Sequence, residues 1–259
     1  MAEHIWGSEE AFVEKMNERA KGLGMNQTHF INCCGLDVDG HVTSAMDVAL
    51  MSRELISKYP QIHNYSTIWM ENITHTTAKG TSEFGLTNTN KLIKQYQYAT
   101  GLKTGSTSLA KYCVSATASK DGVNLIAVIM AAPDYKVRFK DAAALLNYGF
   151  ANCTVYKDEK MPKLKKITVK DSLTAEISLN YEGDFSYLGA NGEDVSQIEK
   201  RLVLPKSLKA PVKKGDQVGR LEYILNGKVL GNVPIVTKES ADKAGLMEYY
   251  KKAWSLWGL

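Results

Sequence analysis

The sequence lacks the features that mark several large classes of protein. No window approaches the run of about 18 consecutive apolar residues that a membrane-spanning helix needs. The N-terminus, Met1-Ala2-Glu3-His4, reaches charged and polar residues at once and does not have the pattern of a secretory signal. The formal net charge of +4 is mild and comes with no known nucleic-acid motif. These absences argue against a helical membrane protein and against a nucleic-acid-binding protein.

Signatures of metal binding are also missing. The four cysteines, Cys33, Cys34, Cys113 and Cys153, show no CxxC pair, and no HExxH motif supplies histidine ligands. Cys33 and Cys34 are adjacent, a geometry that rarely closes on itself, and four cysteines leave three pairings open. We interpret the cysteines as small, buried, hydrophobic thiols and expect no metal site.

Lysine is locally abundant although the overall charge is mild. One interpretation is a solvated face, and the alternative is attraction to an anionic membrane or wall polymer. The lysines of the two stretches are Lys157, Lys160, Lys163, Lys165, Lys166 and Lys170, then Lys206, Lys209, Lys213 and Lys214.

The first part of the chain shows helical signals, in a chain long enough for one large or two ordinary domains. Ser8 is placed as the N-cap of a first helix that ends at Gly22. A loop over residues 25–41 follows, and a second helix begins at Ser44 and stops before Pro60. This second helix carries four apolar side chains on one side: Val48, Met51, Leu55 and Ile56.

From Thr100 the pattern changes to strands. Residues 112–119 and 123–130 are β-rich runs joined by Lys120-Asp121-Gly122, which is a hairpin signal. A helix is predicted over residues 137–150. Its candidate buried side chains are Val137, Ala144, Leu145 and Tyr148. Helices that flank antiparallel strands indicate an α+β domain.

The remainder of the chain has a different pattern. Residues 154–237 hold short β-prone segments between turns, with Asn226-Gly227 as the strongest hairpin signal. An amphipathic helix is predicted over residues 241–259, and it lies either in a membrane interface or on its own domain. Its apolar side consists of Leu246, Tyr250, Trp254 and Trp257.

The segment that points to chemistry is Gly101-Leu102-Lys103-Thr104-Gly105-Ser106-Thr107. Its Lys-Thr-Gly triplet is shared by penicillin-binding proteins and class A β-lactamases, and it lies at the start of the predicted hairpin. Lys103 and Thr104 offer a cation and a hydroxyl to a peptide carboxylate. Gly105 lets a substrate strand approach closely. The backbone N–H of Ser106 can stabilise a tetrahedral oxyanion.

Further segments match a known pattern along nearly the whole chain. They are residues 12–17, 23–25, 28–30, 32, 35–36, 41–45, 47, 87–92, 101–105, 112–118, 125–128 and 212–216. In this order they resemble the serine D-alanyl-D-alanine carboxypeptidases, the low-molecular-weight penicillin-binding proteins of peptidase family S11. So many ordered matches are far more specific than the triplet alone.

The resemblance implies an α+β fold in three parts. Residues 1–152 would be the C-terminal part of a β-lactamase/transpeptidase-like peptidase domain. Residues 153–238 would form a small all-β domain, and residues 239–259 a C-terminal amphipathic helix. The implied location is the outer face of the cytoplasmic membrane, with a signal peptide upstream of this chain.

The resemblance also implies an activity. The family removes the terminal D-alanine of peptidoglycan stem peptides through an acyl-enzyme, is inhibited by β-lactams, and needs no metal or organic cofactor. Lys103, Thr104 and Gly105 would bind the substrate, and the N–H of Ser106 would be half of the oxyanion hole. Arg138 resembles a family arginine close to the active site.

Two motifs of the family are not found where its chemistry needs them. A Ser-x-x-Lys nucleophile and a Ser-x-Asn motif would both precede Ala2, so we expect the chain to begin just after the second motif and to be inactive alone. Met1 would then be an internal methionine or the edge of an incomplete gene. Ser108-Leu109-Ala110-Lys111 has the right spelling but runs into a strand, and Ser178-Leu179-Asn180 lies in the β-domain.

Three other hypotheses remain. A degenerate, non-catalytic domain could bind stem peptides while the β-domain docks partners or wall polymers, and an in-frame Ser-x-x-Lys upstream of Met1 would count against it. The chain could also be a fragment with no folded state. A metal hydrolase is the weakest alternative, because no ligand cluster supports it.

Overall fold

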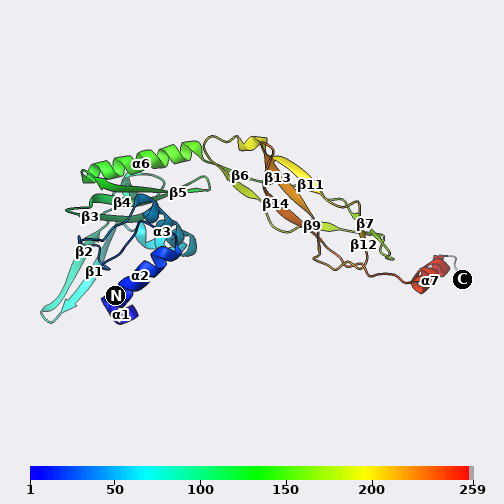
Figure 1. Ribbon diagram of the computed structural model, residues 1–259, viewed down its shortest axis with the longest axis horizontal. Coiled ribbons are helices and arrows are strands. Elements are labelled where there is room, and N and C mark those ends of the chain that lie inside the picture. The colour runs from blue at the N-terminus through cyan, green and yellow to red at the C-terminus, as the bar shows by residue number, and fades with distance from the viewer. Residues whose placement is uncertain (257–259) are drawn as a thin grey trace. The chain divides into compact units, whose positions relative to one another are not determined.

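A computed structural model describes residues 1–256 of the chain. The chain divides into two units, Met1–Asn152 and Cys153–Leu259, and each has hydrophobic clusters of its own. The first unit mixes helices with antiparallel strands, and the second is built almost entirely of strands (Figure 1). The predicted α+β fold class is confirmed.

A three-stranded antiparallel sheet is the centre of the first unit. It consists of β3 (Ala99–Thr107), β4 (Lys111–Lys120) and β5 (Val123–Ala132), in the order β3-β4-β5. The turn between β4 and β5 places Asp121 and Gly122 at φ 50° and 78°, a left-handed conformation that suits Gly and Asp. The predicted hairpin is confirmed, and β3 lies at one edge of the sheet.

Helices lie on both sides of this sheet. In Figure 1, α6 (Tyr135–Asn152) runs along one face, and α3 (Ala45–Lys58) lies on the opposite side. The core forms between α6 and the sheet, where Phe139 and Leu146 pack against alternate residues of β4, among them Ala116. Burying an apolar side chain of this size stabilises the fold by about 1.5–3 kcal/mol. This core therefore holds the strands in place from the face of the sheet that α6 covers.

The remaining helices of this unit precede the sheet. Ser8 caps α2 (Glu9–Gly22) as predicted, because its side chain accepts from the N–H of Ala11 at 3.2 Å. The short elements are α1 (Ala2–Trp6), η1 (Pro60–Ile62), α4 (His63–Ser66) and α5 (Leu92–Gln95).

The predicted buried side of α6 is wrong. Leu145 and Tyr148 are 50% and 65% exposed. The buried face instead carries Arg138, Phe139 and Leu146, together with Ala142. The apolar pattern misled because a charged residue, Arg138, occupies part of this face, while two large apolar residues face solvent.

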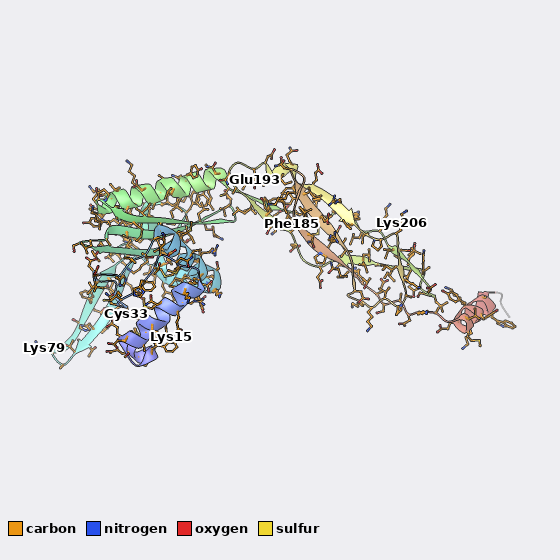
Figure 2. All side chains as sticks on the ribbon, viewed as in Figure 1. Lys15, Cys33, Lys79, Phe185, Glu193 and Lys206 are labelled. Carbon is orange, nitrogen blue, oxygen red and sulfur yellow. The ribbon has the colours of Figure 1, made fainter. Side chains whose placement is uncertain are left out.

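One exposed hairpin was not predicted. Strands β1 (Met70–Thr77) and β2 (Gly80–Thr87) pair antiparallel, and every residue in them is exposed. Lys79 lies at its tip (Figure 2). Gly80, at φ 126° beside two Thr-rich runs, was the signal that could have revealed it.

Within residues 153–256, the second unit contains three small sheets. Their strand orders are β11-β13-β14-β9, β12-β7-β8 and β10-β6. The strands are β6 (Thr154–Lys157), β7 (Ile167–Lys170), β8 (Glu176–Ile177), β9 (Leu179–Tyr181), β10 (Ser186–Gly189), β11 (Glu199–Val203), β12 (Ser207–Lys209), β13 (Gln217–Leu225) and β14 (Lys228–Thr237), with the short helix η2 (Val195–Gln197). Asn226-Gly227 joins β13 to β14, which confirms the predicted hairpin.

The predicted start of the last helix is wrong. Ala241 is buried and forms an isolated β-bridge with Val212. The helix α7 (Leu246–Leu256) begins five residues later. Trp257 and the rest of the predicted range lie outside the described residues.

A buried carboxylate, Asp158, lies in the second unit and is paired with a lysine, Lys200, that reaches it from the surface. Asp158 accepts from Lys200 Nζ at 2.6 Å and from the hydroxyl of Tyr223 at 2.8 Å. Tyr223 is fully buried and stacks on Phe185, with ring centroids 3.7 Å apart (Phe185 is labelled in Figure 2). Burial raises the pKa of Asp158, but the bonds from Lys200 and Tyr223 outweigh it and leave the pKa lowered.

We predict that Asp158→Asn lowers the free energy of unfolding by about 2 kcal/mol, because it weakens the charge-assisted hydrogen bonds that Lys200 and Tyr223 donate to a buried carboxylate. The contribution of Asp158 is complete above the unfolded pKa of about 3.9 and is lost as the pH falls through the lower folded value. Calorimetry at pH 7 and pH 3 measures both effects. Glu193→Gln, on the exposed partner of Tyr187, is the control and should change stability little. Equal losses in the two variants would contradict the prediction.

Candidate active site

The Lys-Thr-Gly triplet lies in the edge strand β3. Along this strand, Lys103 is exposed, Thr104 is 7% exposed, and Gly105 is exposed again. This alternation is that of a strand with one covered face. The edge position leaves one side of β3 without a neighbouring strand in the described sheet. A peptide could therefore lie alongside the triplet.

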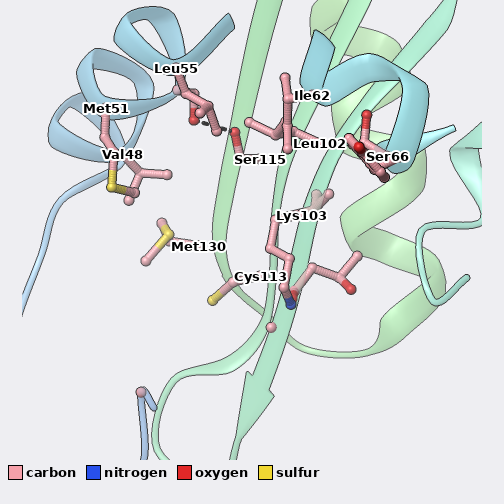
Figure 3. A pocket seen from close by; sticks show the side chains of 16 residues that line it. Val48, Met51, Leu55, Ile62, Ser66, Leu102, Lys103, Cys113, Ser115 and Met130 are labelled. Carbon is pink, nitrogen blue, oxygen red and sulfur yellow. Dashed lines mark hydrogen bonds between the residues drawn. The ribbon is translucent and has the colours of Figure 1, made fainter. Parts of the chain in front are cut away.

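A cleft of about 700 Å³ opens between α3 and the sheet (Figure 3). Lys103, Thr104 and Gly105 form part of its wall, and none of its 16 lining residues is acidic. The other side chains in it are mostly apolar. They include Val48, Met51 and Leu55 of α3, Ile62, Leu102, Val114 and Met130.

The apolar side of α3 therefore lines an open cleft and not a closed core. Met51 remains 40% exposed, and the fully buried residues of α3 are the polar Asp47 and Ser52. Ser52 reaches across to Ser115 of β4, and their Oγ atoms lie 2.7 Å apart. This bond joins α3 to the central strand at the base of the cleft (Figure 3).

The polar groups of the triplet are held by short bonds. Lys103 Nζ donates to the carbonyl of Thr104 at 2.5 Å. The hydroxyls of Thr104 and Thr89 lie 2.6 Å apart. Thr89 had no predicted role, although it belongs to the segment 87–92 that matched the family pattern. A cation and a positioned hydroxyl side by side can bind a carboxylate.

Arg138 is not among the residues that line the cleft. It lies on α6, behind the sheet, and its Nη1 atom donates to the carbonyls of Gly105 at 3.2 Å and Cys113 at 3.1 Å. Gly105 and Cys113 are direct partners in β3 and β4. Burial lowers the pKa of Arg138, and the group stays a cation at neutral pH. The hydrogen bonds of Arg138 thus go to the backbone of the triplet strand β3 and of its neighbour β4.

The structure places Ser106 in β3 opposite Tyr112, one residue beyond the part of the strand that lines the cleft. A second depression, of about 650 Å³, lies at the base of the β1–β2 hairpin. Lys103 and Thr104 line this depression too, together with Trp69 and Glu71. The triplet therefore faces two hollows that share its polar side chains.

Neither alternative serine motif contributes a side chain to the cleft wall. Ser108 lies in the exposed turn after β3, where its hydroxyl donates to Asp37 at 3.1 Å. Lys111, its partner in the motif, begins β4. Ser178 and Asn180 belong to the second unit. None of these residues lines the cleft.

The interpretation of the cysteines as buried thiols is wrong for two of them. Cys33 and Cys34 are exposed, and Cys33 Sγ donates to Glu9 at 3.2 Å. Cys113 and Cys153 are half-buried, and Cys113 lines the cleft. All four are free thiols. Cys33 and Cys34 lie in an exposed loop, and the sequence pattern did not reveal their exposure.

Residues 1–256 show neither a metal-binding cluster nor a membrane-spanning helix. No group of three or more His, Cys, Asp or Glu side chains is arranged to hold a metal ion in this part of the chain. Over the same residues, no helix has both the length and the apolar character needed to cross a bilayer.

Comparison with protein families gives two matches. The family described as D-alanyl-D-alanine carboxypeptidase matches residues 1–134. The family described as Penicillin-binding protein 5, C-terminal domain, matches residues 150–243. The first match includes the Lys-Thr-Gly strand and both sides of the cleft.

Individual relatives agree with these families. The chain is 36% identical to D-alanyl-D-alanine carboxypeptidase DacF of Bacillus subtilis, over 99% of this chain and 65% of that protein. It is 33% identical to D-alanyl-D-alanine carboxypeptidase DacD of Salmonella typhimurium, over 95% and 62%. The chain thus spans less than two thirds of the length of these relatives.

Solved structures show the same fold. Penicillin-binding protein 5 of Haemophilus influenzae aligns with a TM-score of 0.62 and 28% identity, over 93% of this chain and 69% of that one. Penicillin-binding protein 6B of Escherichia coli also gives 0.62, at 27% identity, over 90% and 62%.

Two glycines of β3 should respond differently to a methyl group. Gly101 has φ 143°, and a Cβ there would lie 2.5 Å from Ser66 Oγ, whereas a Cβ on Gly105 would meet nothing within 4 Å. We predict that Gly101→Ala lowers the free energy of unfolding by about 1–3 kcal/mol. Gly105→Ala should change it by less than about 0.5 kcal/mol. Urea denaturation measures both, and a similar loss in the two variants would contradict this description of the strand.

Proposed function

The chain belongs to the D-alanyl-D-alanine carboxypeptidase family, and from this membership we propose that its first unit carries the carboxylate-binding wall of a serine-type D-alanyl-D-alanine carboxypeptidase. One observation carries the proposal: Lys103 and Thr104 lie on an edge strand beside a cleft that no acidic side chain lines. In the cleft a peptide carboxylate would meet a cation and a hydroxyl, whereas the acidic Glu71 lies in the neighbouring depression.

In the proposed complex, the stem peptide lies along β3. Its terminal carboxylate contacts Lys103 and Thr104, and the carbonyl of the penultimate D-alanine points to the N–H of Ser106. A serine hydroxyl attacks this carbonyl, the terminal D-alanine leaves as the free amino acid, and water then hydrolyses the acyl ester. A β-lactam would acylate the same serine, which is the basis of the proposed sensitivity to these inhibitors.

Gly105 and Arg138 would act on the strand itself. A side chain at Gly105 would stand between β3 and the peptide, so its absence allows close approach. We propose that Arg138 is a positioning residue, because its hydrogen bonds go to the backbone of Gly105 and Cys113. By this route it would affect the substrate without touching it.

The attacking serine is not supplied by any Ser-x-x-Lys segment near the cleft. In the first unit the matching segment is residues 108–111, whose serine donates to Asp37 in an exposed turn. Residues 240–243 have the same spelling but belong to the second unit. We therefore propose that this chain alone is inactive and that the nucleophile and the Ser-x-Asn motif belong to a longer protein. A non-catalytic protein that binds stem peptides would use the same wall, and it is the second candidate function.

For the second unit we propose the division into a β-domain over residues 153–238 and a C-terminal amphipathic segment. In α7, Leu246, Tyr250 and Trp254 are exposed at intervals of four residues, which suits an interface between membrane and water. This would place the protein at the outer face of the cytoplasmic membrane after export.

Co-sedimentation with anionic vesicles tests the contact between α7 and a membrane. Trp254→Ser should weaken binding to the vesicles, and unchanged binding would contradict the proposed contact.

The proposed wall can be tested by peptide binding. We predict that diacetyl-L-Lys-D-Ala-D-Ala shifts the backbone amide NMR signals of residues 103–106. Lys103→Gln should weaken this binding about tenfold, because a charge-assisted contact with the carboxylate is lost. Lys79→Gln, at the tip of the β1–β2 hairpin, is the matched control and should have no effect.

The peptide with a C-terminal amide separates carboxylate recognition from general binding. If the amide bound as well as the free acid, Lys103 and Thr104 would not be the carboxylate site. Shifts confined to residues outside β3 would contradict the proposal in the same way.

A further inference from the structure

A further, smaller cavity of the first unit lies between α5 and α6. It has a volume of about 340 Å³ and is formed by α5, the residue before it, and the first half of α6. It shares no lining residue with the cleft or with the depression at the hairpin base. The function proposed above gives it no role.

The rim of this cavity is positively charged. Lys91, Lys136 and Lys140 line it, and no acidic residue does. None of the three forms an ion pair in the part of the chain that the structure describes, although other lysines do so elsewhere. Asp134 is near in sequence, but its carboxylate accepts from the backbone N–H groups of residues 136 and 137.

The charged groups converge on one aromatic ring. Lys91 Nζ lies 4.9 Å and Lys136 Nζ 5.9 Å from the ring centroid of Tyr135. Lys140 follows Lys136 by four residues on the same helix, so the two side chains share a face. Like charges held this close repel each other, and a bound anion would relieve the repulsion.

The floor of the cavity is apolar, and one neutral amide lies at its side. Leu92 and Phe139 are 1% and 4% exposed and belong to the core, so the floor is rigid. Gln95 adds an amide that can both donate and accept. The cavity thus combines a cationic rim, a neutral hydrogen-bonding group and an apolar base.

We propose that this cavity binds a phosphate ester of a small polyol. Lysine binds phosphate as a point charge, whereas bidentate recognition of a carboxylate favours arginine, which does not line the cavity. A volume of about 340 Å³ lies at the low end of ligand cavities and suits a group the size of glycerol phosphate. Such a group occurs in polyol-phosphate polymers and in phospholipid head groups.

The test is a titration of the isotope-labelled chain, followed by NMR. The probes are a soluble glycerol-phosphate trimer, dihexanoyl phosphatidylglycerol below its micelle concentration, inorganic phosphate, and glycerol as the neutral control. We expect the trimer or the lipid to shift the amide signals of residues 91–95 and 135–140, and glycerol to leave them unchanged. A stronger response to the trimer identifies the polymer as the source, and a stronger response to the lipid identifies the head group.

Two double variants that each remove two positive charges distinguish a specific site from general electrostatic attraction of anions to the protein surface. K136Q/K140Q removes two rim lysines, and K21Q/K79Q removes two exposed lysines outside all the cavities described above. We expect the first pair to weaken binding about tenfold and the second to change it less than about twofold, because only the first loses direct contacts. Equal weakening in both pairs, or no shift at these residues with either ester, would overturn the proposal.

Discussion

The candidate site depends on the way α6 holds the sheet from behind. Phe139 and Leu146 bury their side chains against β4, and this packing brings Arg138 under the paired strands. There its guanidinium bonds the carbonyls of Gly105 and Cys113, which face each other across β3 and β4. A buried cation without a carboxylate partner is costly unless such acceptors satisfy it. The packing of α6 against the sheet therefore also determines where the triplet strand lies.

The face of the sheet toward α3 is less closely covered than the face toward α6. Val48, Met51 and Leu55 of α3 face the sheet across an open cleft, and the Ser52–Ser115 bond joins α3 to β4 at its base. A surface of this kind stays accessible to a peptide, and it also leaves apolar side chains in contact with solvent. The proposed function uses the polar edge of this cleft, where Lys103 and Thr104 lie.

Much of this arrangement could be predicted from the sequence, and the failures have physical causes. Turn chemistry revealed the hairpins at Asp121-Gly122 and Asn226-Gly227, because few residues adopt left-handed φ. The triplet was found from its residue types and its place before a hairpin. The buried face of α6 was not, since a hydrogen-bonded arginine occupies a position that an apolar pattern reserves for leucine. The contact between Thr89 and Thr104 joins distant segments, and no local signal reports it.

The central claim is that the first unit holds the binding wall of a carboxypeptidase but no competent serine. The most direct measurement is the intact mass of the folded chain after incubation with benzylpenicillin. The account predicts an unchanged mass. An increase of one penicilloyl group would contradict it, and Ser108 would then be the first residue to re-examine as the nucleophile.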